Sequence, residues 1–169
     1  MFPKTVFPDT TTVDSQGQLV IGGCNALDLV SQYGTPVYIL DEQTLRARCR
    51  SFVQEFRQRW ENSQVCYACK AYINPALAQI FDEEGLGLDV VSGGELAIAQ
   101  RVGFPLERVT FHGNNKTPDE LEYALANGIG TVAVDSFYEL DLLNQTAAAA
   151  GKVQNIIIRV SPGVDPHTH

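Results

Sequence analysis

From residue 65 onward, short apolar runs alternate with amphipathic segments of ten or more residues. Runs that are apolar throughout are typical of strands buried on both faces, and segments of this length form the crossover helices between parallel strands. Each expected strand ends in one polar residue, and these residues are Lys70, Asp89, His112, Asp135 and Arg159. They are separated by 19, 23, 23 and 24 positions. A repeat of this length, with a polar group at each carboxyl end, predicts a β/α barrel.

Signals for the ends of strands and helices support the same interpretation. The expected strands are residues 36–40, 65–70, 87–91, 108–112, 131–135 and 155–160. Three segments have Ser or Thr three positions before Glu, which is the capping box that begins a helix; they are residues 92–95, 117–120 and 136–139. No G-x-G-x-x-G motif follows the first strand, which argues against a dinucleotide-binding Rossmann fold.

The number of strands limits what this chain can form. A closed β/α barrel has eight strands and about 250 residues, whereas five strands follow the repeat from Lys70, or six with residues 36–40. We therefore predict an α/β fold in which residues 36–169 form a partial TIM barrel with five to six of eight strands. Residues 1–35 lack the repeat and read as an arm with a short strand and a short helix. We expect the chain to be the amino-terminal piece of a longer enzyme.

Lys70 is the first candidate for chemistry. Side chains alternate along a strand, so Lys70 shares a face with Ala68 and Cys66, whose small side chains leave space around the amine. The carboxyl end of a barrel strand is where such folds place their ligand sites. An amine in a partly apolar pocket loses some preference for the charged form and can attack a carbonyl. The alternative interpretation is a solvated charge at the end of a strand.

Several separated segments carry a resemblance to a known family. Residues 67–71 (YACKA) resemble the segment of the alanine-racemase-like, fold-type III enzymes whose lysine binds pyridoxal 5′-phosphate (PLP). Three further segments are similar, more narrowly, to the diaminopimelate decarboxylase family: residues 86–96 (LGLDVVSGGEL), 111–116 (FHGNNK) and 159–169 (RVSPGVDPHTH). Residues 33–38 (YGTPVY) are similar to that family's entry into the barrel. Ser161, where the family pattern has asparagine, is a departure.

The resemblance implies a PLP-dependent carboxy-lyase that converts meso-2,6-diaminopimelate to L-lysine in lysine biosynthesis, with Lys70 as the catalytic residue that binds the cofactor. It also implies an amino-acid substrate, a homodimer for the full-length enzyme, and an arm, 1–35, that joins a second, all-β domain. The family's groups for the phosphate, the pyridine nitrogen and the substrate carboxylates lie beyond residue 169. We therefore expect residues 1–169 to be inactive alone. Two alternatives stay open: an ornithine- or arginine-type PLP decarboxylase, and a non-catalytic PLP-binding barrel protein.

Three more residues are cofactor-binding candidates. Asp89 points inward beside Lys70 if its neighbours pack outward, and the resemblance places it next to the cofactor. Arg159 lies in an otherwise apolar strand, where a buried guanidinium requires an anion; either it belongs to the polar cluster at the cofactor, or it pairs structurally with Asp135 or Asp89. His112 either contacts cofactor or substrate or is a structural histidine.

Composition argues against other classes of function. Twelve Lys and Arg against twenty Asp and Glu give a net charge of −8, and no basic run suggests a nucleic-acid partner. The apolar stretches are shorter than the ~20 residues of a membrane span. Cys66 and Cys69 have the spacing of a metal or redox pair but no second pair, and His167 and His169 lie at a terminus, so we expect no metal. Four cysteines without disulfide-scaffold density predict a cytoplasmic protein.

Overall fold

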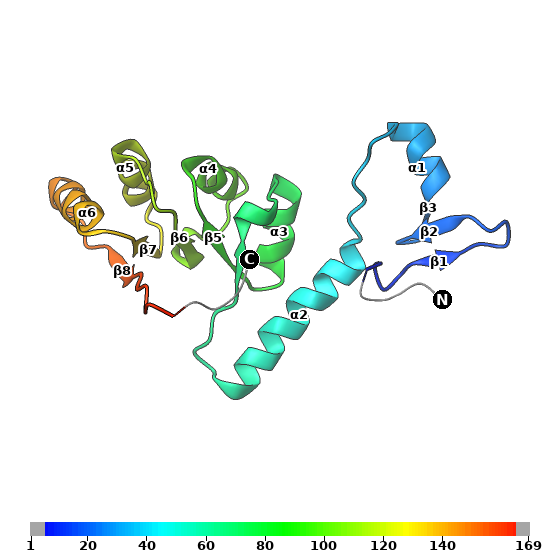
Figure 1. Ribbon diagram of the computed structural model, residues 1–169, viewed down its shortest axis with the longest axis horizontal. Coiled ribbons are helices and arrows are strands. Elements are labelled where there is room, and N and C mark those ends of the chain that lie inside the picture. The colour runs from blue at the N-terminus through cyan, green and yellow to red at the C-terminus, as the bar shows by residue number, and fades with distance from the viewer. Residues whose placement is uncertain (1–5, 165–169) are drawn as a thin grey trace. The chain divides into compact units, whose positions relative to one another are not determined.

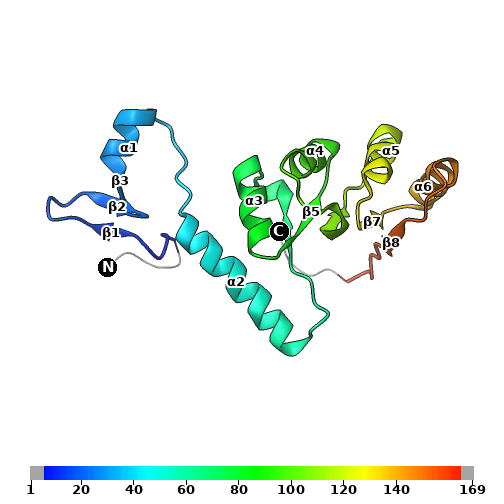
Figure 2. The ribbon, with the colours of Figure 1, turned by 180° about the vertical axis from the view of Figure 1, so that it is seen from behind.

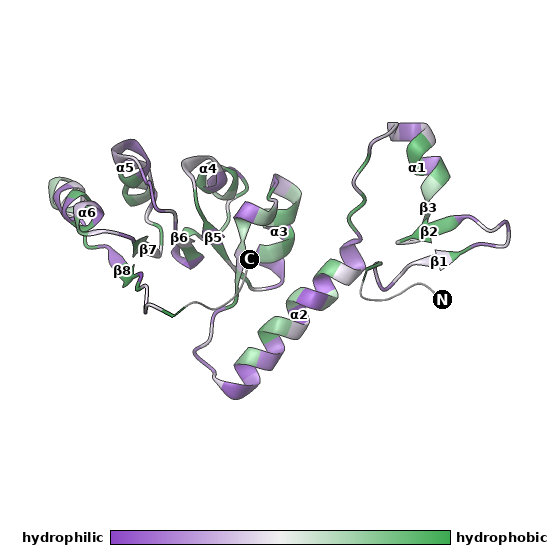
Figure 3. Cartoon of the chain, viewed as in Figure 1, coloured by the Kyte–Doolittle hydropathy of each residue, from purple (hydrophilic) through white to green (hydrophobic). Residues whose placement is uncertain are grey.

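The computed structural model describes residues 6–164, and the chain divides into two compact units, Met1–Glu61 and Asn62–His169 (Figure 1). The first unit contains a three-stranded antiparallel sheet in the order β1-β2-β3. Its elements are β1 (Thr12–Val13), β2 (Leu19–Ile21), β3 (Cys24–Asn25), α1 (Ala26–Tyr33) and α2 (Glu42–Arg59). The strand and the helix that we expected in the arm are therefore present as β2 and α1. Figure 3 shows hydrophobic and hydrophilic bands alternating along α2, as expected for an amphipathic helix.

The expected strand at residues 36–40 is not formed: residues 37–40 have no regular secondary structure. The Tyr38 and Leu40 side chains are exposed. A strand is stabilised by hydrogen bonds to a neighbouring strand, and among residues 6–164 no strand pairs with this segment. The parallel sheet therefore has five strands, the lower number of the predicted range.

The second unit is a parallel sheet with the strand order β4-β5-β6-β7-β8. The strands are β4 (Cys66–Ala68), β5 (Gly87–Val90), β6 (Val109–Phe111), β7 (Thr131–Val134) and β8 (Asn155–Ile158). They are joined through α3 (Pro75–Glu83), α4 (Gly93–Arg101), α5 (Pro118–Asn127) and α6 (Phe137–Ala149), with short 3-10 helices at η1 (Cys69–Ala71) and η2 (Leu106–Arg108). The four α-helices lie side by side in both views (Figures 1 and 2). This repeat confirms the predicted α/β architecture and gives part of a barrel.

The pattern of burial along β5 shows which way its side chains point. Leu88 and Val90 are fully buried, while Asp89 between them is half-buried. Parallel pairing sets Ala68 of β4 opposite Asp89, and Phe111 of β6 opposite Val90. Asp89 therefore faces away from the apolar side chains of its own strand, as we predicted.

The helix starts follow the sequence signals, with one informative difference. Ser92, Thr117 and Ser136 each accept a hydrogen bond from the backbone N–H three residues later. However, only the box at Thr117 closes in both directions, with the Glu120 carboxylate accepting from the Thr117 N–H at 2.9 Å. In the other two segments the glutamate carboxylate has another partner, the Val91 N–H for Glu95 and the Lys116 ammonium for Glu139. Within residues 6–164, no helix combines the length and the apolar character needed to cross a membrane.

Candidate active site at the carboxyl ends of the strands

An open cleft of about 690 Å³ lies at the carboxyl ends of the parallel strands. Its lining consists of Lys70, Asp89, Val91, His112, Gly113, Asn114, Asn115 and Arg159. The structure thus brings together all four site residues predicted from the sequence, from four different strand ends. Their roles toward a cofactor stay predictions.

Lys70 enters this cleft from a turn, which corrects the expected extension of the strand through residue 70. Strand β4 ends at Ala68, and Lys70 lies in the 3-10 helix η1. A 3-10 helix rotates the chain by about a third of a turn per residue instead of the half turn of a strand, so strand alternation no longer predicts the direction of the Lys70 side chain. Cys69 is buried as a result, whereas Lys70 is exposed and lines the cleft. The small-residue face that we expected around the amine is therefore replaced by an open, polar surrounding.

Asp89 and His112 form a close pair on adjacent strands. Nδ1 of His112 lies 2.5 Å from Oδ1 of Asp89, and both side chains are partly exposed to the cleft. An ionised carboxylate can only accept a hydrogen bond, so Nδ1 of His112 carries the hydrogen in this pair. The contact fixes the orientation of the imidazole ring and leaves its Nε2 atom for another partner. His112 is therefore both structurally paired and located in the cleft.

Arg159 pairs with Asp135, one of the two carboxylates expected for it. The guanidinium Nη1 lies 2.9 Å from Oδ1 of Asp135, and the Arg159 side chain is 64% exposed. The backbone N–H of Arg159 donates to Val134 O at 3.0 Å, which continues the pairing of β8 with β7 beyond the assigned strand end. An exposed ion pair contributes at most about 1 kcal/mol to stability. Its effect is mainly to hold the guanidinium at the edge of the cleft.

One buried ion pair, next to the 113–115 segment of the cleft lining, is not predicted from the sequence. Nζ of Lys116 lies 2.8 Å from Oε1 of Glu139, and the two side chains are 1% and 6% exposed. From the sequence, Glu139 is the last residue of a capping box, and Lys116 is the last residue of the FHGNNK segment. The signal in the sequence is the position of Lys116, which lies directly before the expected helix start at Thr117 and four residues after the expected strand 108–112.

The two thiols beside Lys70 are weakly acidic. Burial raises the pKa of Cys69 to about 12, and the Glu95 and Asp89 carboxylates add to this effect. Burial, followed by the charge of Asp89, also raises the pKa of Cys66. A thiolate is the form that binds metals and attacks disulfides, so neither sulfur suits those roles near neutral pH. Across residues 6–164, no group of three or more His, Cys, Asp or Glu could hold a metal ion. The pair His167 and His169 lies outside the described residues.

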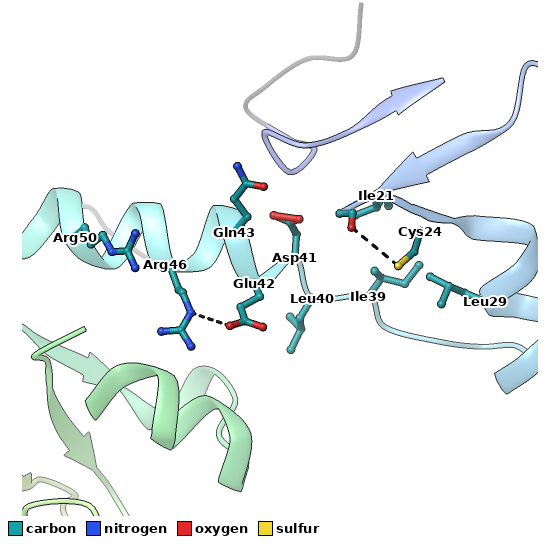
Figure 4. Close-up of a pocket in the computed structure, with 11 residues that line it drawn as sticks. Ile21, Cys24, Leu29, Ile39, Leu40, Asp41, Glu42, Gln43, Arg46 and Arg50 are labelled. Carbon is teal, nitrogen blue, oxygen red and sulfur yellow. Dashed lines mark hydrogen bonds and ion pairs between the residues drawn. The ribbon is translucent and has the colours of Figure 1, made fainter. Parts of the chain in front are cut away.

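A second hollow, of about 620 Å³, lies within the first unit (Figure 4). Its wall includes Leu29 and Leu40, and its charged groups already have partners. Arg46 Nε donates to Glu42 Oε1 at 2.7 Å. Burial would raise the pKa of Asp41, but hydrogen bonds from Thr44 and Thr10 outweigh it and lower that pKa. Because these charges are engaged in structural contacts, the cleft of the second unit is the better candidate for chemistry.

Comparison with known proteins gives consistent matches. Residues 42–169 match the family model described as pyridoxal-dependent decarboxylase, pyridoxal binding domain. The chain is 46% identical over 163 residues to the diaminopimelate decarboxylase of Bacillus methanolicus, covering 96% of this chain and 38% of that protein. It is 47% identical over 160 residues to that of Bacillus subtilis, covering 95% of this chain and 36% of that protein. The chain thus spans just over a third of the length of these relatives.

Solved structures agree with the sequence matches. The diaminopimelate decarboxylase of M. jannaschii has a TM-score of 0.83 at 33% identity, covering 95% of this chain and 38% of that one. The lysine/ornithine decarboxylase of Vibrio vulnificus has a TM-score of 0.63 at 20% identity, over 88% of this chain and 38% of that one, which shows a shared fold. The family match includes the whole parallel sheet and every residue that lines the cleft, so the chain belongs to the pyridoxal-dependent decarboxylases, within their pyridoxal-binding domain.

Proposed function

We propose that the protein is a diaminopimelate decarboxylase, which forms L-lysine from meso-2,6-diaminopimelate, and that Lys70 binds its PLP cofactor. The observation that carries this proposal is the placement of Lys70 in one cleft with the Asp89–His112 pair and Arg159. Its support from relatives is the 42–47% identity to proteins named diaminopimelate decarboxylase over nearly the whole chain.

The donor set of the cleft fits PLP. PLP carries an aldehyde, and Lys70 is the amine among the cleft residues that can bond to it. Arg159 supplies a positive charge at the cleft edge for an anionic group, and Asp89 orients His112 through its Nδ1 hydrogen. When bound, PLP supplies an electron sink for the electron pair that remains after a carboxylate leaves as CO₂. The chain's own residues would hold and orient the reacting groups in this scheme.

The relatives favour diaminopimelate over other basic amino acids as the substrate. The M. jannaschii structure in complex with L-lysine is 33% identical to this chain, and the Helicobacter pylori complex with L-lysine is 31% identical. Neighbours named lysine/ornithine and arginine decarboxylase are only 20% identical and support the fold alone. We further propose a homodimer for the full-length protein and a second β domain joined by the 1–35 arm. We also propose a cytoplasmic location, which is supported by four free cysteines without disulfide-scaffold density.

The test uses the full-length protein purified with PLP. Borohydride reduction followed by peptide mapping should place the cofactor label on Lys70, and incubation with meso-diaminopimelate should release CO₂ and L-lysine. The Lys70→Arg variant keeps the charge and should lose the label. The matched control is Lys152→Arg, because Lys152 lies outside the cleft and donates to Leu125 O and Ala126 O. Label at another lysine would refute the assignment. Putrescine from ornithine or agmatine from arginine would support the alternative decarboxylases. Bound PLP without turnover would support a non-catalytic PLP-binding barrel.

A further inference from the structure

The ion pair between Lys116 and Glu139 is the buried charge of the second unit. Lys116 and Glu139 are 7% and 5% exposed as whole residues, and no other charged residue between positions 6 and 164 is buried to this degree. Glu139 Oε1 has no conventional hydrogen bond, so the ammonium 2.8 Å away is what balances its charge. Taking two charges out of water is costly, and an apolar pair of similar volume is often as stable. Stability alone therefore does not explain the pair.

The contacts of Lys116 connect a loop, a strand and a helix of the second unit. Its Nζ atom donates to Gly113 O at 2.6 Å and to Ala133 O at 2.9 Å, in addition to the pair with Glu139. Two of the three ammonium hydrogens are thus donated to backbone carbonyls, while the contact with Glu139 is an ion pair without a hydrogen bond. Lys116 therefore ties the loop after β6 to strand β7 and to the first turn of α6.

That loop forms one wall of the cleft. Gly113, Asn114 and Asn115 all line it, and the loop begins directly after His112. Gly113 has φ = +107°, and a Cβ at this position would lie 3.1 Å from Val91 O, so the loop passes close to the end of β5. The loop thus lies against Val91, just after β5, and its Gly113 carbonyl accepts a hydrogen bond from the Lys116 ammonium.

We propose that Lys116 is a positioning residue, held in place by Glu139, that fixes the 113–115 loop and thereby His112 as a wall of the PLP cleft. Lys116 itself is buried and does not line the cleft. This inference rests on the proposed function for its effect on PLP. Its effect on the loop can be measured independently of the cofactor.

The decisive variant is Lys116→Met/Glu139→Leu in the full-length protein. It removes both charges together and fills their space, so the midpoint of urea unfolding should stay near the wild-type value. It also removes the bond to Gly113 O. We therefore expect amide hydrogen exchange at residues 113–116 to become about tenfold faster or more, and the PLP dissociation constant to rise about tenfold or more, from the loss of hydrogen bonds to a charged donor.

Lys152→Met is the matched control, because Lys152 also donates to two backbone carbonyls, those of Leu125 and Ala126, but lies outside the cleft. It should leave exchange at 113–116 and PLP affinity unchanged. If the apolar double variant does not fold, Lys116→Met/Glu139→Gln also removes both charges, keeps the volume at position 139 and leaves no donor at position 116, so it should show the same two changes.

Wild-type exchange at residues 113–116 in a folded double variant would overturn the inference, whatever the cofactor does. Accelerated exchange with unchanged PLP affinity would also overturn it, since the loop would then have no effect on the cleft. The proposed function fails differently, through the absence of PLP binding by the wild-type protein. In that case the exchange measurement on the apoprotein still decides whether Lys116 fixes the loop.

Discussion

An aromatic stack links α3 to the turn that carries Lys70, and its contribution can be measured. The rings of Tyr67 on β4 and Phe81 on α3 have centroids 4.1 Å apart and an interplanar angle of 26°. Phe81 is 1% exposed, and the Tyr67 hydroxyl donates to Tyr72 O at 2.9 Å, across the turn that contains Lys70. A pair of this geometry contributes about 0.5–1.5 kcal/mol beyond the burial of its apolar area.

The test is a double-mutant cycle with Phe81→Leu and Tyr67→Leu, followed by urea unfolding at 25 °C. Phe81→Leu keeps most of the apolar volume and should lower the unfolding free energy by about 1–2 kcal/mol, of which about 1 kcal/mol is the lost stack. In the Tyr67→Leu background the same substitution should therefore cost about 1 kcal/mol less. Leu143→Ala on α6, toward the other end of the sheet, provides the additive control with Phe81→Leu (Figure 1). A coupling below about 0.3 kcal/mol would show that the rings pack independently and would refute this reasoning.

Three further predictions concern the sheet and its helix ends. Gly130→Ala should lower the unfolding free energy by about 1–3 kcal/mol in urea, because the new Cβ would lie 2.1 Å from the backbone oxygen of Glu107. Burial would raise the pKa of Glu120, but hydrogen bonds from backbone N–H groups lower it below its usual 4.5. The ionised Glu120 carboxylate should therefore contribute about 1 kcal/mol, as a cap does, to the unfolding free energy above pH 4.5. This contribution should disappear as the pH falls through the lowered pKa, so the acid unfolding curves of wild type and Glu120→Gln should converge. Because the pKa of Cys69 is about 12 and its side chain is buried, iodoacetamide at pH 7.5 should label the exposed Cys24 well before Cys69, as peptide mapping would show.

The sequence predicts the sheet and the cleft because both depend on patterns that are local in the chain. Continuous apolar runs identify buried parallel strands, and the apolar neighbours of Asp89 determine which way its carboxylate faces. Parallel strands bring their carboxyl ends to the same edge, so a polar residue at each end is sufficient to predict the cluster of Lys70, Asp89, His112 and Arg159. No knowledge of distant contacts is needed for these predictions.

The predictions that differ from the structure depend on contacts that the apolar pattern of a strand does not contain. Whether residues 36–40 form a strand depends on a pairing partner, which the apolar composition of the segment does not provide. Whether Lys70 continues a strand depends on the turn that buries Cys69, and this turn is bridged by the bond from Tyr67 to Tyr72. Alternation along a strand predicts a side chain's direction only as far as the strand continues, and β4 ends two residues before the lysine.

Two capping boxes do not close, and the one at Ser136 shows how local and distant contacts compete. Glu95 Oε2 accepts from the Val91 N–H at 2.7 Å, at the strand end that lines the cleft, and the Glu139 carboxylate pairs with Lys116. A helix cap contributes about 1 kcal/mol. A buried lysine left without its counter-charge would cost about 3–5 kcal/mol. Once the fold buries Lys116, the carboxylate of Glu139 is worth several times more beside that ammonium than at the start of its own helix. Ser136 alone then caps α6, and the open capping box of this helix is the consequence of the buried charge of Lys116.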